Sequence, residues 1–187
     1  MNFLNKLEKQ YRKYAIPNLM YYIVMLYGAG LVIQLFAPMA YWRFLSLDIG
    51  ALMHGQIWRL VTFIIYPPTM GTFVFDSVFF GIISLFLYYS LGVTLERVWG
   101  AFRFNVFFLM GMVGEILAAL VSYFVFHQNL YVTTGFLNFS LFLAFAICFP
   151  DVQFYLFMVI PVKAKWMAIA ESAVYVYSFL VGSASTR

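Results

Sequence analysis

Long apolar runs with few charges alternate along the chain with shorter segments that carry most of the charged residues. A helix needs about 20 apolar residues to cross the ~30 Å hydrocarbon core of a bilayer. The pattern therefore predicts an all-α polytopic membrane helix bundle with five spans. The predicted spans are Pro17–Ala37, Phe73–Leu95, Phe104–Phe126, Phe136–Phe149 and Trp166–Val181. Small residues share one face of the second span (Ser77, Gly81, Ser84) and recur in the third (Gly111, Gly114, Ala118), which allows another helix to approach closely.

The fourth run is shorter than the others. It lies within Thr133–Pro150, an uncharged stretch that starts with small polar residues and Gly135 and stops at Pro150-Asp151. About 14 helical residues rise only ~21 Å, which is less than the hydrocarbon thickness. We therefore predict a short helix in the middle of the bundle, with a polar cluster at its outer end as the first place to look for chemistry.

Two connecting segments have an apolar pattern of their own. In Pro38–Thr72 apolar residues recur every three or four positions, and Trp42 and Trp58 are suited to the headgroup level. This predicts a helical hairpin or a helix half-sunk in the outer interface, with its end at Pro67-Pro68. The apolar run Val152–Pro161 is too short to span, so we expect residues 151–165 to lie at the interface.

The 11 Lys and Arg residues divide unevenly between the two sides of the predicted bundle. One side holds Lys6, Lys9, Arg12, Lys13, Arg97, Arg103, Lys163 and Lys165, and the other holds Arg43, Arg59 and Arg187. The positive-inside rule then predicts a multi-pass integral membrane protein with a cytoplasmic N-terminus, in the plasma membrane if the source is bacterial. Residues 1–16 form a basic amphipathic tail on the membrane surface, 17–182 the membrane domain, and 183–187 a short tail.

Composition supports lipid as the solvent of this chain. Of its residues 65% are hydrophobic and only 10% are charged, whereas soluble domains carry about 25% charged residues. The basic residues do not cluster on one polar surface, so no nucleic-acid partner is expected. No Cys, His, Asp and Glu residues have metal-site spacing, and no glycine-rich loop follows a strand, so neither a metal nor a cofactor is predicted.

Three short motifs occur in order along the chain. Residues 55–62 read Gly-Gln-Ile-Trp-Arg-Leu-Val-Thr, residues 91–104 contain Leu-Gly, Glu-Arg and Gly-Ala-Phe-Arg, and residues 160–166 read Ile-Pro-Val-Lys-Ala-Lys-Trp. With the predicted topology and the short fourth helix, they resemble the rhomboid superfamily, which includes intramembrane serine proteases and inactive relatives such as the derlins. The resemblance covers most of residues 17–182. It gives structural roles to Gln56, Trp58, Arg59, Gly92, Glu96, Gly100, Arg103 and Gly135. We expect residues 91–104 to form a charged turn that Glu96 and Arg103 cap and hold. We expect Arg59 to anchor its loop by binding a backbone carbonyl or a lipid phosphate.

The resemblance also implies where catalytic groups would lie. Active rhomboids carry Gly-X-Ser-Gly at the outer end of the fourth helix, a histidine on the sixth, and a histidine and asparagine on the second. Here the fourth helix opens Gly-Phe-Leu-Asn, so Leu137 stands at the serine position and has no nucleophile to offer. The second-helix positions fall on about Phe80 and Ser84, and the given chain ends before a sixth helix.

The family analogy therefore implies a pseudoprotease whose partners are the lipid bilayer and transmembrane segments of other proteins. One alternative is a divergent intramembrane serine protease that uses Ser140 with His127. Against it, Ser140, Ala144 and Cys148 recur at four-residue spacing, which favours close helix packing. A serine in a membrane helix also commonly bonds its own backbone.

A further alternative is a small transporter centred on Glu115, because an intramembrane acid is a candidate functional site by default. The structural interpretation is a carboxyl hydrogen-bonded to a polar partner such as Asn138, Ser84 or a tyrosine. We favour this interpretation over a proton relay, since no chain of further intramembrane acids accompanies Glu115.

Overall fold

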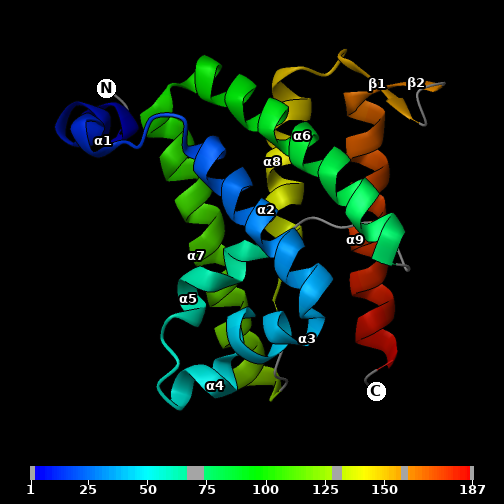
Figure 1. The fold of residues 1–187 in the computed structure, drawn as a ribbon. Coiled ribbons are helices and arrows are strands. Elements are labelled where there is room, and N and C mark those ends of the chain that lie inside the picture. Colours follow the sequence, from blue (N-terminus) through cyan, green and yellow to red (C-terminus); the bar gives the residue numbers. More distant parts are fainter. Residues whose placement is uncertain (1–2, 67–73, 128–131, 157–159, 186–187) are drawn as a thin grey trace. The chain divides into compact units, whose positions relative to one another are not determined.

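The computed structural model describes residues 3–66, 74–127, 132–156 and 160–185 (Figure 1). Helix makes up 81% of it, so the mostly helical fold predicted from the apolar pattern is confirmed. The α-helices are α1 Phe3–Tyr11, α2 Leu19–Phe36, α3 Pro38–Ala40, α4 Ile49–Met53, α5 Arg59–Thr62, α6 Val74–Trp99, α7 Ala101–Phe126, α8 Gly135–Cys148 and α9 Ala164–Ser185. Short 3-10 helices η1 Arg12–Tyr14 and η3 Phe63–Ile65, a π-helix η2 Tyr41–Leu45, and strands β1 Gln153–Leu156 and β2 Ile160–Lys163 complete the structure.

Three described helices are long and apolar enough to cross a membrane, which fits a multi-pass membrane protein. They are Leu19–Phe36, Phe79–Trp99 and Ala101–Val125. These segments correspond to the first three predicted spans. The apolar helix Gly135–Cys148 is shorter, as predicted for the fourth run.

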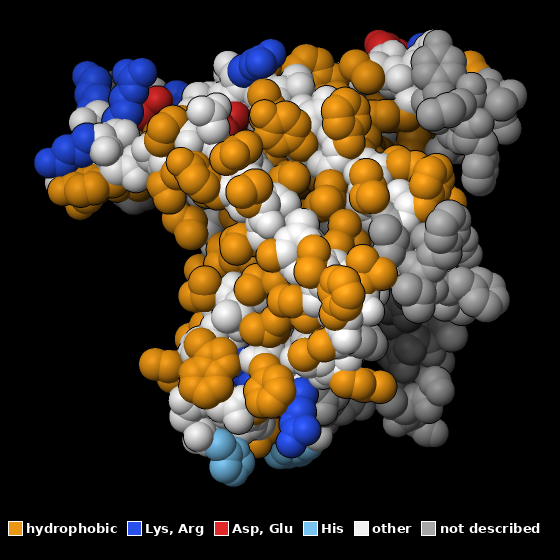
Figure 2. Space-filling model, viewed as in Figure 1, with side chains coloured by type: hydrophobic (Ala, Val, Ile, Leu, Met, Phe, Trp, Pro, Cys, Tyr) orange, Lys and Arg blue, Asp and Glu red, His pale blue; other side chains and the backbone are white. Residues whose placement is uncertain are grey.

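The chain divides into two compact units, Met1–Ser140 and Leu141–Arg187, and α8 contributes its first part to one and its second part to the other. In the first unit, α2 packs along α6 and buries Met20, Ile23, Tyr27 and Leu31 at helical spacing. Figure 2 shows hydrophobic side chains over the exposed lengths of α2 and α6, whereas the Lys and Arg side chains of the N-terminal segment gather at one end. The predicted amphipathic N-terminal helix is present as α1.

The boundary between the second and third spans is much tighter than predicted. We expected a charged turn over residues 91–104, but α6 continues to Trp99 and α7 starts at Ala101. Leu91 and Leu95 are buried and extend the apolar face of α6 through this segment. The reversal falls on Gly100, whose φ of +84° suits a residue without a Cβ.

The described part of the 38–72 segment, called the outer connection after its predicted side, is neither a single helix nor a simple hairpin. It consists of the short helical segments α3, η2, α4, α5 and η3, and Gly55 takes a φ of +93° between α4 and α5. A positive φ breaks a helix, so the apolar periodicity of this segment is spread over several helical pieces. Its predicted end at Pro67-Pro68 lies outside the described residues.

In the second unit, β1 and β2 pair as an antiparallel hairpin ahead of α9. Gln153 pairs with Lys163 and Leu156 with Ile160. The Lys163 ammonium lies 2.9 Å from a carboxylate oxygen of Asp151, and the Lys165 ammonium lies 3.7 Å from the same oxygen. The predicted fifth span, Trp166–Val181, lies within α9.

Candidate functional site

The first turn of α8 carries a buried polar network, as the small polar residues at its start predicted. The Thr134 hydroxyl donates to the Tyr66 carbonyl at 2.8 Å, and the Asn138 amide donates to the Thr134 hydroxyl at 3.2 Å. Tyr27 of α2 donates its hydroxyl proton to Asn138 Oδ1 at 3.0 Å. Because Thr134, just before α8, and Asn138 of α8 are both buried, this network fixes the start of the helix against α2.

Glu115 of α7 forms a second link to the same helix end. Its Oε1 accepts a hydrogen bond of 2.8 Å from the backbone N–H of Leu137. The first N–H groups of a helix have no partner within the helix, and this end of the helix dipole favours a carboxyl group. Glu115 therefore caps α8 from a neighbouring helix, rather than pairing with the Asn138, Ser84 or tyrosine side chains that the sequence suggested.

The second carboxyl oxygen of Glu115 is unusual. Only 6% of Glu115 is exposed, and Oε2 is buried without a hydrogen-bond partner among the described residues. A buried polar atom without a partner costs free energy, about 1–3 kcal/mol. Two other described side-chain oxygens, Gln34 Oε1 and Glu96 Oε2, are buried without a partner in the same way.

Leu137 occupies the position that the family resemblance gives to the catalytic serine. Its side chain is 2% exposed and packs against α7, where a Cβ on Gly111 would lie only 2.6 Å from Leu137 Cδ1. Its carbonyl accepts a 2.7 Å hydrogen bond from the Ser140 hydroxyl. Both backbone groups of Leu137 are thus engaged.

The structure places the alternative catalytic pair on different elements. Ser140 is half-buried on α8, and its proton is directed to its own helix. His127 is exposed just after α7, in a left-handed conformation with φ +53°. Among the described residues, no hydrogen bond joins the two. The two second-helix positions that the resemblance points to, Phe80 and Ser84, lie on α6, where Phe80 is partly exposed and Ser84 is buried.

A cavity of 350 Å³ lies between α7 and the first turns of α8. It is lined by Gly111, Gly114, Glu115, Ala118, Ala119, Val132, Phe136, Leu137 and Ser140. A Cβ built on Gly114 would meet no atom within 4 Å, so this glycine leaves space open. The small residues Gly111, Gly114 and Ala118 of the third span therefore form one wall of the cavity, which is almost entirely apolar.

Arg59 organises the outer connection from within. Its side chain is buried, with 3% exposed. Nη1 donates to the Ser46 carbonyl and Nε donates to Gln56 Oε1, each at 2.7 Å. Nη2 donates to the Arg43 carbonyl. Trp58 donates its indole N–H to the Phe44 carbonyl at 3.1 Å. These contacts join residues 43–59 into one ordered segment.

Tyr41 begins the π-helix of the same segment and is buried. Its hydroxyl donates to the Phe63 carbonyl at 3.1 Å. Burial raises the pKa of Tyr41 above its ordinary value, so the phenol remains a neutral hydrogen-bond donor.

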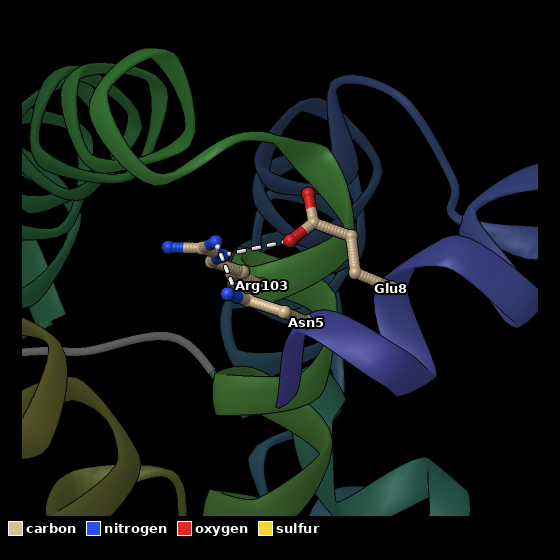
Figure 3. A network of polar contacts seen from close by, with 3 residues as sticks. All are labelled: Asn5, Glu8 and Arg103. Carbon is tan, nitrogen blue, oxygen red and sulfur yellow. Dashed lines mark hydrogen bonds and ion pairs between the residues drawn. The ribbon is translucent and has the colours of Figure 1, made fainter. Parts of the chain in front are cut away.

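The residues of the 91–104 motif contact segments far away in sequence. Gly92 packs against Met20, and Glu96 Oε1 accepts a 2.7 Å hydrogen bond from the backbone N–H of Asn18. Arg103 reaches back to α1, where it lies 3.0 Å from Glu8 Oε2 and 3.1 Å from Asn5 Oδ1 (Figure 3). We expected Glu96 and Arg103 to hold their own turn, but they hold the N-terminal segment instead.

Tyr27 was not identified from the sequence as a site residue. In the sequence it could have been found as a tyrosine on the face of α2 that otherwise buries apolar side chains.

Within the described part of the chain, no three Cys, His, Asp or Glu residues could hold a metal ion. No protein-family model matches the chain, and comparisons with curated proteins and with solved structures give no match.

Proposed function

We propose that this chain is a non-proteolytic, rhomboid-like integral membrane protein that binds or guides other membrane proteins. The hydrogen bond from the Leu137 N–H to Glu115 carries the non-proteolytic part of the proposal. In serine proteases the backbone N–H of the nucleophile helps to stabilise the oxyanion. Here a carboxyl oxygen accepts that hydrogen bond, and a leucine replaces the nucleophile.

The proposed architecture has five spans, with α9 as the fifth and the N-terminus in the cytoplasm. The length of α9 supports this assignment, since its 22 residues exceed the ~20 needed for a crossing. The basic residues of α1 support the orientation. In this arrangement the short α8 helix belongs inside the bundle.

The partner role comes from the rhomboid resemblance, and the outer connection offers a surface for it. Met39, Met53, Ile57 and Val61 are all well exposed on this segment. Arg59 holds the segment in one conformation, so its apolar side chains form a defined surface. Such a surface suits the membrane interface and a partner helix that approaches through it.

Photocrosslinking in membranes tests the partner role. Leu137 and Ser84 are buried, so the photoreactive residue is best placed at their exposed neighbours Phe136 and Phe80. We expect adducts with membrane proteins that do not form from Leu109, an equally lipid-accessible control on α7. Absence of any adduct specific to the two test positions would contradict partner binding.

Labelling with a serine-directed fluorophosphonate tests the absence of protease chemistry. We expect no labelling of the wild-type protein, because the Ser140 proton is held by the Leu137 carbonyl. Labelling that disappears in Ser140→Ala would favour the protease alternative and reject the non-proteolytic assignment.

A further inference from the structure

The N-terminal segment and the first turn of α7 border a cavity of 450 Å³ that is separate from the one beside Glu115. Every residue that lines it is polar or charged: Asn5, Glu8, Lys9, Arg12 and Arg103. The first four are spaced three, four and seven positions apart, which places them on one face of the N-terminal segment. This face is turned toward the start of α7, where Arg103 lies.

Several contacts hold the two walls of this cavity together. Arg103 Nε lies 3.0 Å from Glu8 Oε2, and Arg103 Nη2 donates to Asn5 Oδ1 at 3.1 Å (Figure 3). Farther along, the Asn105 amide of α7 donates to the Ile16 carbonyl at 2.9 Å. The N-terminal segment is therefore positioned on α7 at two places, and the lining side chains already face one another without a ligand.

The cavity has an excess of positive charge. Lys9, Arg12 and Arg103 supply three positive charges, and Glu8 supplies one negative charge. Among the described residues, the ion pairs involve neither Lys9 nor Arg12, and both side chains are exposed. Figure 3 also shows that one guanidinium nitrogen of Arg103 makes neither of the two marked contacts and points away from α1. Donors from both walls are therefore available to an anion.

We propose that this cavity binds the phosphate group of an anionic phospholipid. Arginine and lysine side chains donate strong, charge-assisted hydrogen bonds to phosphate oxygens. A phosphate monoester carries a charge of about −1.5 to −2 at neutral pH, which balances the two excess positive charges of the cavity. The first turn of α7 contains no acidic residue, and the dipole at this end of the helix favours an anion as well.

The surroundings of the cavity favour a lipid over a free phosphate. Tyr11, Tyr14 and Ile16 are exposed between the cavity and α2, and the Lys13 ammonium lies 4.9 Å from the centre of the Tyr14 ring. Figure 2 shows basic side chains gathered over the N-terminal segment and hydrophobic side chains along α2. Basic and aromatic side chains side by side suit the headgroup level of a membrane. A phospholipid bound there can place its phosphate in the cavity and its acyl chains beside α2.

Native mass spectrometry of the full chain, released from detergent micelles, tests this proposal with single lipids. The probes are dioleoylphosphatidic acid, which carries a phosphate monoester, and dioleoylphosphatidylcholine, which has the same acyl chains and no net charge. Micelles of a neutral detergent present no anionic surface, so the affinity reports direct contacts. We expect phosphatidic acid to bind about tenfold more tightly or better, the ratio that one charge-assisted hydrogen bond supplies. Soluble glycerol 3-phosphate at the same concentration should not displace it, because it has no acyl chains.

Two double variants separate the cavity from general attraction to a basic segment. Lys9→Gln with Arg12→Gln removes the two unpaired cations of the cavity, and the affinity for phosphatidic acid should fall about tenfold or more. Lys6→Gln with Lys13→Gln removes the same charge from exposed positions that do not line the cavity. This control should change the affinity by less than about threefold, since exposed charges outside a site contribute little. Circular dichroism should show the same helix content for both, because all four side chains are exposed.

Three results would overturn the proposal. Equal binding of the two lipids would exclude a phosphate site, and equal loss of affinity in the two double variants would show attraction to the whole segment rather than to the cavity. Displacement by glycerol 3-phosphate at equal concentration would show that the ligand is a free phosphate and not a lipid. Each result can occur whether or not crosslinking finds a protein partner, so the two proposals fail independently.

Discussion

Arg59 shows how one buried side chain determines a long connection. The sequence identified it as a loop anchor that binds either a backbone carbonyl or a lipid phosphate. In the structure its guanidinium group bonds the carbonyls of Ser46 and Arg43 and the side chain of Gln56. A planar guanidinium can donate in several directions at once, which explains why an arginine suits this position.

Loss of the Arg59 side chain should destabilise the outer connection. We expect Arg59→Ala to lower stability by about 3 kcal/mol, because buried carbonyls lose donors that carry a charge. Arg59→Lys should recover less than half of the loss, since one ammonium cannot reach all three acceptors. Thermal unfolding in detergent, together with proteolysis within residues 38–65, measures both effects.

Arg43→Ala is the matched control, because Arg43 is exposed in the same segment. Its side chain stacks on Phe44, a contact worth about 0.5–1 kcal/mol. Equal destabilisation by the Arg43 and Arg59 substitutions would contradict the anchoring role of Arg59.

The hydrogen-bond partner of Glu115 could not be predicted from the sequence. Its position in an apolar run showed that the carboxyl needed a partner, since an intramembrane acid is costly. The partner is a backbone N–H of α8, and backbone donors are present at every residue, so the sequence could not single one out. The Ser140 hydrogen bond was easier to predict, because it stays within one turn of the same helix.

At the level of elements, glycines determine how closely α2 and α6 approach. A Cβ on Gly92 would lie 2.3 Å from Met20 Cγ and 2.9 Å from Met20 Cβ. A Cβ on Gly81 would lie 2.6 Å from Leu31 Cδ2, the far end of a flexible side chain. Small residues thus allow the two helices to pack closely, as the small-residue face of the second span predicted in general terms.

Alanine substitutions at three glycines should give graded effects. Gly92→Ala should cost about 1–3 kcal/mol, because Met20 is fully buried and cannot move away as a whole. Gly81→Ala should cost less, since Leu31 can change rotamer. Gly28→Ala should be neutral or stabilising by up to about 1 kcal/mol, because its Cβ meets nothing and alanine favours helix.

Unfolding midpoints in one detergent, measured for all three variants, would check this order. An equal loss of stability in Gly28→Ala and Gly92→Ala would show that helix contact at Gly92 does not limit the packing.

The apolar pattern located the helices better than the segments between them. The predicted first and third spans match α2 and α7 to within a few residues, since long periodic runs specify helices strongly. The pairing of β1 with β2 was not predicted, because each strand is only four residues long and the pairing depends on register. Charges at the end of α6 were taken for a turn, although the buried leucines continue the helix.

The hairpin has an electrostatic contribution that can be titrated. The hydrogen bond from Lys163, its charge and that of Lys165 lower the pKa of Asp151 below the ordinary value of about 3.9. The ion pairs therefore contribute at a pH above that ordinary value, and the contribution is lost as the pH falls through the lowered pKa.

Carbon-13 NMR of labelled Asp carboxyl groups can follow this titration. Lys163→Met should raise the pKa of Asp151 toward its ordinary value, and Lys165→Met should raise it less, since its ammonium is farther away. A pKa of Asp151 that is unchanged by Lys163→Met would contradict the pairing.

On the scale of the whole molecule, the distribution of basic residues predicts an orientation in the membrane. The junction of α6 with α7 and the short helix α4 lie toward opposite ends of the first unit (Figure 1). The excess of basic residues in the N-terminal tail and the 91–104 segment predicts that this end faces the cytoplasm. On this scale the mostly helical fold could be predicted from the sequence. The cavity lined by Glu115 could not, because it forms only where α7 packs against α8.

Cysteine accessibility tests the orientation in intact cells. In a Cys148→Ser background, an impermeant maleimide should label His54→Cys directly and Arg97→Cys only after permeabilisation. Both positions are exposed, so access depends on the side of the membrane. The reverse pattern would contradict a cytoplasmic N-terminus.

The central claim is that a rhomboid-like membrane domain binds membrane proteins without cleaving them. Its most direct test is the fate of a partner crosslinked from Phe136, followed over time in the wild-type protein and in Ser140→Ala. We expect an intact partner of full length in both, with equal yield. Shortened partner fragments that form with the wild-type protein and disappear in Ser140→Ala would contradict it.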